Sequence, residues 1–315
     1  MSTVLSIGEV LWDLFPDAQH LGGAPFNFAA SCARLGHQAF LLTAVGQDEL
    51  GRRTLEGIRS SRVSTELVQR TSEAGTGTVL VEFDSHHEPH YTIRRPAAYD
   101  FLHLDERSIR EIARCRPDFL CFGTLNQLYK NNRDVIGILV AELPDALRFY
   151  DVNLRKDSFN LDLLRELMSL AQIIKLNESE TEVVQTLFGK TVTTLENFCR
   201  TYSEQFGWRS VWVTRGAEGC SIFQDGKFVE AGGFSVASPH PVGAGDAFSA
   251  AVCHGISQGW PPERIGEFAN RVGAIVASRP GAVSDWTIED CYALTCSHEP
   301  SASHNDTVND GRARF

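Results

Sequence analysis

The residues of this chain best suited to chemistry lie in the segment 241–248, which reads Pro-Val-Gly-Ala-Gly-Asp-Ala-Phe. A glycine-rich turn here enters a helical pattern, because apolar residues recur at helical spacing from Phe248 onward. Such a turn directs several backbone N–H groups at one spot, which favours an anion such as a phosphate. We expect Asp246 at this spot to take a proton from a hydroxyl that attacks the phosphate. The alternative is that Asp246 only caps the helix and the glycines only form a turn.

The composition limits the classes of protein to which the chain could belong. It has 315 residues, of which 43% are hydrophobic and 22% charged, as in an ordinary globular protein with a sizeable core. The net charge of −11 argues against nucleic acid as a main partner, because phosphate backbones are bound by basic surfaces. We find no membrane-spanning stretch and no signal peptide. The eight cysteines are scattered, so we expect reduced core thiols in a cytoplasmic protein.

Short apolar runs alternate with amphipathic stretches such as 161–170 along most of the chain. This alternation predicts an α/β fold with a mostly parallel sheet and helices on both faces. The runs that we expect to be buried strands are 4–7, 40–45, 119–122, 149–152, 173–176 and 211–214.

The segment 76–93 departs from this alternation. It reads as two strands around a polar turn, which predicts a β-hairpin that projects from the main sheet and covers a site. The tail 298–315 is polar and has no periodicity, so we expect it to be disordered.

Six separated segments match, in order, motifs of one family. They are Leu21–Ala29 (LGGAPFNFA), Val45–Gly51 (VGQDELG), Asp151–Arg155 (DVNLR), Asn177–Glu180 (NESE), Val213–Gly219 (VTRGAEG) and Gly243–Asp246 (GAGD). On these motifs the chain to about residue 295 resembles the PfkB family of carbohydrate kinases, and within it the fructokinase branch. Each motif alone is weak, but six in the correct order over the chain are specific.

The resemblance implies a fold, a division of the chain and a catalytic centre. The fold would be ribokinase-like, with three α/β/α layers, a mostly parallel central sheet and a small β-sheet lid. Residues 1–297 would form the kinase domain, with the lid supplied by about 10–24 and 76–100. Asp246 would be the general base, and the amides of Gly243, Ala244 and Gly245 would stabilise charge on the transferring phosphoryl group.

The same resemblance assigns residues to the two substrates. The residues expected to bind the sugar are Asp13, Gly22, Gly23, Asn27, Asn153 and Arg155. Asn27 has the alternative of being only a polar residue in the first turn of a helix, and Arg155 that of a solvated surface arginine. The residues expected to contact ATP are Asn177, Thr214, Gly216, Gly219 and Asn270. Glu180 is expected to position Mg²⁺ through water, with a plain acidic helix N-terminus as the alternative.

One departure from the family pattern precedes the GAGD motif. The family usually has Asp-Thr before the valine, whereas this chain has His240 and Pro241. In related kinases that aspartate helps to bind a monovalent cation, and a histidine is a poor ligand for K⁺. We therefore do not expect K⁺ activation, although the segment 279–282 resembles the other part of the cation loop.

We therefore expect a kinase that transfers the γ-phosphate of ATP to a primary hydroxyl of a sugar. Fructose is the first candidate for the acceptor sugar, and Mg²⁺ is the expected cofactor. Alternatives are 2-keto-3-deoxygluconate, ribose or a nucleoside as acceptor, or a non-catalytic regulator that binds sugar or nucleotide. An acidic sugar would need an added cation, for which Arg94, Arg95 and Arg155 are candidates. The expected partners are small molecules, without nucleic acid or membrane, and a homodimer could form through the lid.

Overall fold

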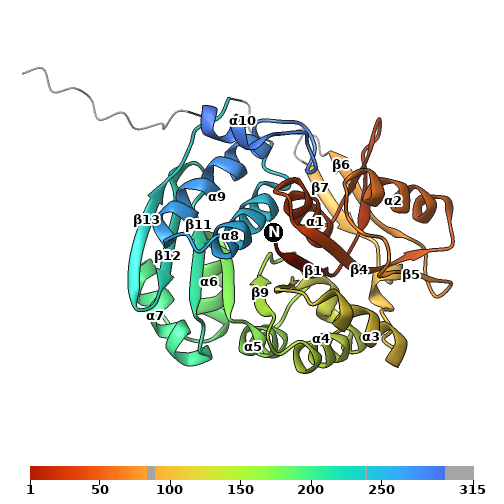
Figure 1. Cartoon of the computed structure of the whole chain (residues 1–315), viewed down its shortest axis with the longest axis horizontal. Helices are drawn as coiled ribbons and strands as arrows, with labels where there is room; N and C mark the ends of the chain where they lie inside the picture. The colour runs from red at the N-terminus through yellow and green to blue at the C-terminus, as the bar shows by residue number, and fades with distance from the viewer. Residues whose placement is uncertain (84–88, 238–239, 295–315) are drawn as a thin grey trace, which may run out of the picture.

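The computed structural model describes residues 1–83, 89–237 and 240–294, and its main element is a nine-stranded sheet (Figure 1). The strand order is β13-β12-β11-β10-β9-β8-β1-β4-β5, and the pairs from β5 to β11 are parallel, while β12 and β13 are added antiparallel. The strands are β1 (Thr3–Ile7), β4 (Gln38–Gly46), β5 (Val68–Thr71), β8 (Phe119–Phe122), β9 (Leu147–Asp151), β10 (Ile173–Asn177), β11 (Ser210–Thr214), β12 (Gly219–Gln224) and β13 (Lys227–Gly232). All six predicted buried strands are present in this sheet.

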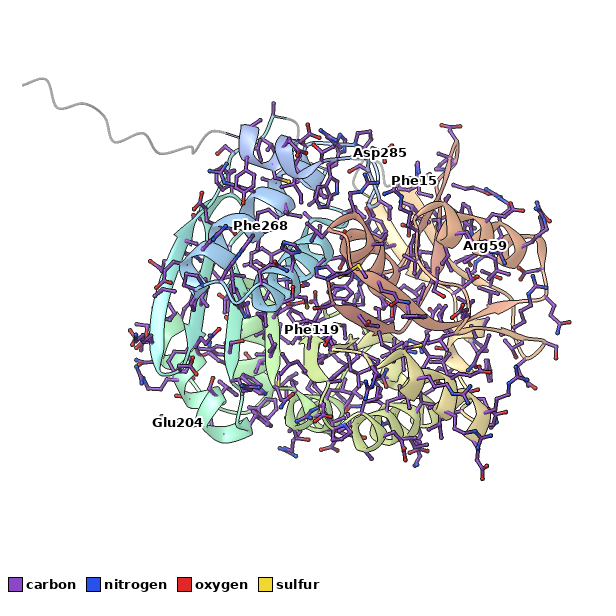
Figure 2. All side chains as sticks on the ribbon, viewed as in Figure 1. Phe15, Arg59, Phe119, Glu204, Phe268 and Asp285 are labelled. Atoms are coloured by element: carbon purple, nitrogen blue, oxygen red, sulfur yellow. The ribbon has the colours of Figure 1, made fainter. Side chains whose placement is uncertain are left out.

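Helices cover both faces of the sheet and form the two outer layers. Side chains of α1 (Ala24–Arg34), α2 (Glu49–Ser60), α8 (Ala244–Ser257), α9 (Pro262–Ala277) and α10 (Ile288–Ala293) belong to one buried cluster. A second cluster contains side chains of α3 (Glu106–Cys115), α4 (Lys130–Glu142), α5 (Leu161–Leu170), α6 (Glu178–Leu187) and α7 (Leu195–Phe206). Phe119 on β8 and Phe268 on α9 lie inside the molecule, whereas Arg59 and Glu204 lie at its periphery (Figure 2). The predicted three-layer arrangement is therefore confirmed.

A second, four-stranded sheet lies beside the first, with the order β3-β2-β6-β7. Its strands are β2 (Leu11–Leu14), β3 (Gln19–Gly22), β6 (Gly77–Phe83) and β7 (Pro89–Ile93). The antiparallel pair β6–β7 is the predicted hairpin, and its turn at 84–88 lies outside the described residues. The parallel pairing of β2 with β6 joins the two chain segments from which a lid was expected. The tail 298–315 also lies outside the described residues.

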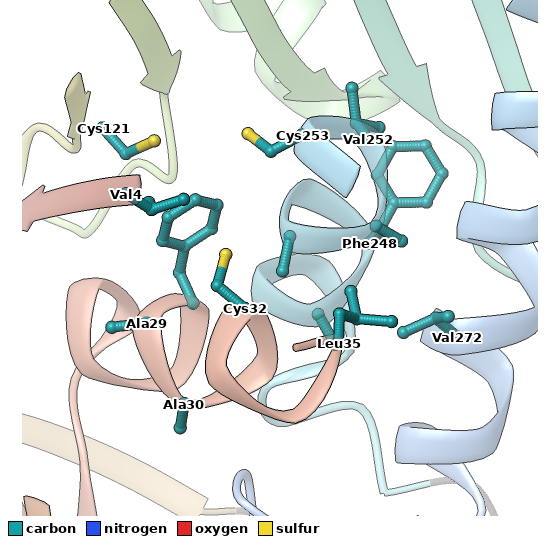
Figure 3. Packing of buried hydrophobic residues seen from close by; sticks show 14 of the residues in the cluster. Val4, Ala29, Ala30, Cys32, Leu35, Cys121, Phe248, Val252, Cys253 and Val272 are labelled. Atoms are coloured by element: carbon teal, nitrogen blue, oxygen red, sulfur yellow. The ribbon is translucent and has the colours of Figure 1, made fainter. Parts of the chain in front are cut away.

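The core between α1, α8 and the sheet contains three of the cysteines. Cys32, Cys121 and Cys253 are at most 4% exposed and come from α1, β8 and α8 (Figure 3). The seven cysteines that the structure describes are free thiols, and burial raises the pKa of Cys32 and Cys121 well above its usual value. These thiols behave as small apolar core residues, which agrees with the prediction from the sequence.

Candidate active site

The residues expected to be functional gather where the parallel strands end. Asp151 is the last residue of β9, Asn177 the last of β10 and Thr214 the last of β11, and Asn177 pairs with Thr214 in register. Carboxyl ends of parallel strands form a common edge, which is where open α/β sheets bind ligands. The N-terminal turn of α8 adjoins this edge, because Ser249 of α8 donates a hydrogen bond to Asp151 (2.8 Å).

Asp246 is the central residue of this edge. It lies in the first turn of α8, but the residue at the N-cap is Gly243, and no side chain caps the helix. The interpretation of Asp246 as an ordinary capping residue is therefore wrong. The side chain is 8% exposed, and burial, together with the charge of Asp151, raises its pKa to about 6. At neutral pH the carboxylate is mostly ionised and is basic enough to accept a proton.

Asn27 on α1 fixes the orientation of this carboxylate. Its Nδ2 donates a hydrogen bond of 2.8 Å to Oδ2 of Asp246, and this bond helps to lower the pKa. Its Oδ1 is buried and has no hydrogen-bond partner among the described residues. The sequence placed Asn27 at the sugar, and the structure shows it in contact with Asp246, with one oxygen left for a further donor.

The turn before α8 presents its amides in the expected way, with one exception. The amide of Ala244 donates to the carbonyl of Pro241 (3.2 Å), whereas those of Gly243, Gly245 and Asp246 have no acceptor among the described residues. Gly243 has φ of +83°, and a Cβ built on it would lie 2.7 Å from the carbonyl oxygen of Ala282. Only glycine fits this position, so the turn is fixed by both conformation and close packing.

Beneath the turn lies a buried charge that the sequence reading missed. Lys175 points from β10 and is 5% exposed, and its Nζ lies 3.1 Å from Oδ1 of Asp151. A Cβ built on Gly245 would lie 3.0 Å from the same nitrogen, so the ammonium is directly below the first turn of α8. Burial lowers the pKa of Lys175, but the carboxylates of Asp151, Glu180 and Asp246 outweigh it and raise the pKa. The sequence could have revealed Lys175, because it lies inside an apolar strand, Ile-Ile-Lys-Leu, where an unpaired charge is costly.

Glu9 is the second residue that was missed. It lies two residues after the end of β1, is 6% exposed, and lines a pocket together with Asp246. Burial raises its pKa to about 7, while Arg155 and Arg95 act in the opposite direction. An acidic residue two positions after a buried parallel strand was the signal that could have found it. The residues lining the pocket are Ser6, Glu9, Ala24, Pro25, Phe28, Cys121, Phe122, Gly123, Thr124, Leu125, Phe149, Asp151, Asn153 and Asp246.

Of the residues expected to bind the sugar, Asn153 lines this pocket, and charge or packing connects others to it. Asp13 lies on β2, close to Gly22 at the end of β3, and burial raises its pKa, while His20 and Arg155 lower it. Asn153 lines the pocket and has a left-handed conformation (φ +39°), which asparagine tolerates. Arg155 is exposed, and its positive charge acts on Glu9, Asp13 and Asp246. The charge of Arg155 therefore connects Asp13 on β2 with Glu9 and Asp246 at the pocket.

The residues expected to contact ATP have structural bonds of their own. Asn177 and Glu180 form a reciprocal cap of α6: Oδ1 of Asn177 accepts from the amide of Glu180 (2.9 Å), and Oε2 of Glu180 accepts from the amide of Asn177 (2.8 Å). The other oxygen of Glu180 accepts from the amide of Leu154 (2.8 Å). Asn270 donates 3.0 Å hydrogen bonds to the carbonyls of Ala231 and Gly232 and so ties α9 to β13.

The remaining ATP candidates lie at the end of β11. Thr214 donates a hydrogen bond to the carbonyl of Leu176 (3.3 Å), Gly216 begins a short 3₁₀ turn, and Gly219 begins β12. Within the described ranges, no group of three or more His, Cys, Asp or Glu side chains is arranged to hold a metal ion. Among the helices of the same residues, none is long and apolar enough to cross a membrane.

The segment expected to form part of a cation loop lies next to its counterpart. The amide of His240 donates to the carbonyl of Ala277 (2.7 Å), and Gly243 packs against Ala282. The imidazole of His240 is exposed. A ring nitrogen is a poor ligand for K⁺, and the expectation that K⁺ does not activate the protein stays a prediction.

Comparison with known proteins identifies the family. The model of the pfkB family of carbohydrate kinases matches residues 13–289. A putative sugar kinase of Pyrococcus horikoshii is 28% identical, over 89% of this chain and 92% of its own length, and a fructokinase of Escherichia coli is 26% identical, over 93% and 96%. The crystal structure of a fructokinase from Xylella fastidiosa with bound ATP superposes with a TM-score of 0.81 at 24% identity, over 93% of this chain and 97% of that one. The chain belongs to the pfkB family of carbohydrate kinases.

Proposed function

We propose that this protein transfers the γ-phosphate of ATP to a primary hydroxyl of fructose. The observation that carries the proposal is the carboxylate of Asp246, which is buried in the first turn of α8, held by Asn27, and has its pKa raised to about 6. Curated fructokinases of Escherichia coli and Salmonella typhimurium, each 26% identical to this chain, support fructose as the acceptor.

The proposed chemistry begins at Oδ1 or Oδ2 of Asp246, which takes the proton of the attacking hydroxyl. A positioned general base typically contributes about 10²- to 10⁴-fold in rate. The free amides of Gly243 and Gly245, with the ammonium of Lys175 below them, would stabilise negative charge on the transferring phosphoryl group. The amide of Ala244, included in the original expectation, contributes less because it already donates to Pro241.

We propose that ATP and Mg²⁺ bind on the side of the glycine turn that faces away from the sugar. Asn177, Thr214, Gly216, Gly219 and Asn270 lie on β10, β11, β12 and α9, and we keep them as candidate contacts to the nucleotide. Mg²⁺ would supply neutralisation of phosphate charge. Both oxygens of Glu180 already accept backbone hydrogen bonds, which fits a contact to a water in the metal's hydration shell rather than to the metal itself.

The charges around the pocket favour a neutral acceptor over an acidic sugar. Arg95, a candidate cation for an acidic sugar, is engaged by the carboxylate of Asp100 and donates to the carbonyl of Leu125 (2.8 Å). Arg155 remains, and it faces the carboxylates of Glu9, Asp13 and Asp246. A further carboxylate on the substrate would enter a pocket that already holds more negative than positive groups, which disfavours 2-keto-3-deoxygluconate.

The four-stranded sheet is proposed as a lid that closes over the sugar and excludes water. Strand β7 is the last strand of this sheet and carries an exposed tyrosine, Tyr91 (55%), which suits pairing with a second copy. If a homodimer forms through this edge, solution scattering at micromolar concentration will give the mass of a dimer, and Tyr91→Lys will lower it. A monomer in the unsubstituted protein contradicts this arrangement.

The decisive experiment measures ADP release from Mg-ATP with D-fructose, ribose, 2-keto-3-deoxygluconate, glucose and adenosine. We expect turnover with fructose that Asp246→Asn reduces by about 10²- to 10⁴-fold without loss of ATP binding. Turnover with a different member would correct the acceptor and leave the kinase assignment intact. If no member of the panel releases ADP while sugar or nucleotide still raises the melting temperature, the non-catalytic binding protein is the better description.

A further inference from the structure

Among the buried charged groups of the pocket region, Glu9 differs in its bonding. Lys175 is paired with Asp151, Asp246 accepts from Asn27, and Glu180 accepts two backbone amides. Among the described residues, the carboxyl group of Glu9 accepts a hydrogen bond from its own backbone amide and none from another residue, although Glu9 is only 6% exposed. A carboxyl group with one local bond keeps lone pairs for a further donor, and leaving them unpaired away from water is costly.

The position of Glu9 shows where a partner would come from. It lines the same pocket as Asp246 and Asn153. Its backbone also packs against the glycine turn expected at the sugar, because a Cβ built on Gly23 would lie 2.6 Å from the carbonyl oxygen of Glu9. The turn, the carboxyl group of Glu9 and the base therefore border one space.

The charged groups around Glu9 keep its carboxyl available to a ligand. Arg155 and Arg95 act on it as positive charges and Asp246 as a negative one. Arg95 is already bound by Asp100, and Arg155 is exposed, so neither forms an ion pair with Glu9. The carboxyl group of Glu9 is therefore an acceptor at the pocket, and it suits a ligand hydroxyl that donates a hydrogen bond.

We propose that Glu9 is a further sugar-binding residue, whose carboxyl group accepts a hydrogen bond from one hydroxyl of the acceptor that is not phosphorylated. This inference rests on the proposed sugar kinase activity and adds a specificity-determining contact to it. A site built to bind a hydroxyl discriminates strongly against an analogue that lacks it, because the buried partner is then left unpaired. The protein should accordingly reject the one deoxy analogue that removes the partner of Glu9.

The test uses the full chain with Mg-ATP, the acceptor sugar, and a set of analogues each lacking one hydroxyl that is not phosphorylated. We measure kcat/KM for the unsubstituted protein, Glu9→Ala and Glu9→Gln. Removal of the contact by Glu9→Ala should lower kcat/KM for the parent sugar by about 10- to 100-fold, as expected for a hydrogen bond to a charged group. For one particular analogue, kcat/KM of this variant should lie within about threefold of its value for the parent sugar. For the unsubstituted protein, kcat/KM for the same two sugars should differ by about 10-fold or more.

A purely structural role of Glu9 would lower kcat/KM for every acceptor by the same factor, and that outcome overturns the inference. Glu9→Gln keeps the shape of the side chain, so it supplies the comparison if Glu9→Ala does not fold; it should weaken discrimination at the same hydroxyl. Asp13→Asn is the matched control, because Asp13 on β2 is a half-buried carboxylate that, like Glu9, is acted on by the charge of Arg155, and it should alter the preference at a different hydroxyl. Absence of turnover by the unsubstituted protein with every sugar overturns the proposed function itself, whereas turnover without coupling at Glu9 overturns this inference alone.

Discussion

The pair Lys175–Asp151 offers the sharpest perturbation of the site. The two charges lie 3.1 Å apart, with side chains 6% and 16% exposed, and Ser249 donates to the second oxygen of Asp151. Removing one partner of a buried pair typically costs about 3–5 kcal/mol, because the remaining charge is left uncompensated. Asp151 keeps the hydrogen bond from Ser249, so we expect Lys175→Met to cost about 3 kcal/mol. For a chain of this length that corresponds to a fall in Tm of roughly 5 °C.

The same substitution changes the chemistry of Asp246 in a defined direction. The charge of Asp151 raises the pKa of Asp246 and that of Lys175 lowers it. The acid limb of the kcat/KM profile should therefore move to higher pH in Lys175→Met, to lower pH in Asp151→Asn, and to an intermediate position in the double variant. The double variant should also recover most of the lost stability, because no uncompensated charge remains.

The assays are urea denaturation and kcat/KM against pH. The control is Lys130→Met, which removes an exposed ion pair with Asp134 and should cost less than about 0.5 kcal/mol. The reasoning fails if Lys175→Met costs no more than Lys130→Met, or if the losses in the two single variants simply add in the double variant.

Three further predictions concern pH and the glycine turn. Because Asp246 must be ionised to act as a base, kcat/KM should fall as the pH drops below about 6, and a flat profile between pH 5 and 8 would contradict its role. Burial and the neighbouring His254 lower the pKa of His37 to about 4, so the unfolded chain protonates first on acidification. The stability contributed by neutral His37 is complete above about pH 6.5 and is lost as the pH falls toward 4. We expect the free energy of unfolding to fall by roughly 1–2 kcal/mol over this range, as measured by urea denaturation at several pH values. His37→Gln should make the free energy of unfolding depend less on pH. Gly243→Ala should cost more stability than Gly259→Ala and should lower turnover at least about tenfold. Both glycines have positive φ, but of the two only Gly243 is crowded, by the carbonyl of Ala282. Equal unfolding midpoints for the two variants would show that this packing does not matter.

Much of the framework could be predicted because its physical signals are local. Each predicted strand is a short apolar run, as in residues 119–122, and such a run is buried on both faces of a parallel sheet. The start of α1 was marked by Pro25, and that of α8 by the glycine turn before it. The strands β12 and β13 were not predicted, because β13 alternates weakly and its residues are largely exposed.

For the site residues, the sequence indicated which side chains to consider but not all of their contacts. The motif around Asp246 singled it out as the candidate base without any structure, since a carboxylate at a glycine-rich helix start is chemically unusual. Asn177, Glu180 and Asn270 were predicted to contact ATP or Mg²⁺, but the sequence did not reveal that each is engaged in hydrogen bonds to the backbone. Those bonds depend on which elements lie next to one another.

The sequence by itself indicated the family, the order of the main elements and Asp246 as the candidate base, because motifs and periodicity are properties of neighbouring residues. Only the tertiary structure decided the contacts across the chain: Asn27 holds Asp246, 219 positions away, and Lys175 pairs with Asp151 beneath α8. It also placed Glu9 at the same pocket as Asp246, without a hydrogen bond to another described residue. Burial and long-range charge set these pKa values and pairings, and both exist only once the sheet has brought the ends of its strands together.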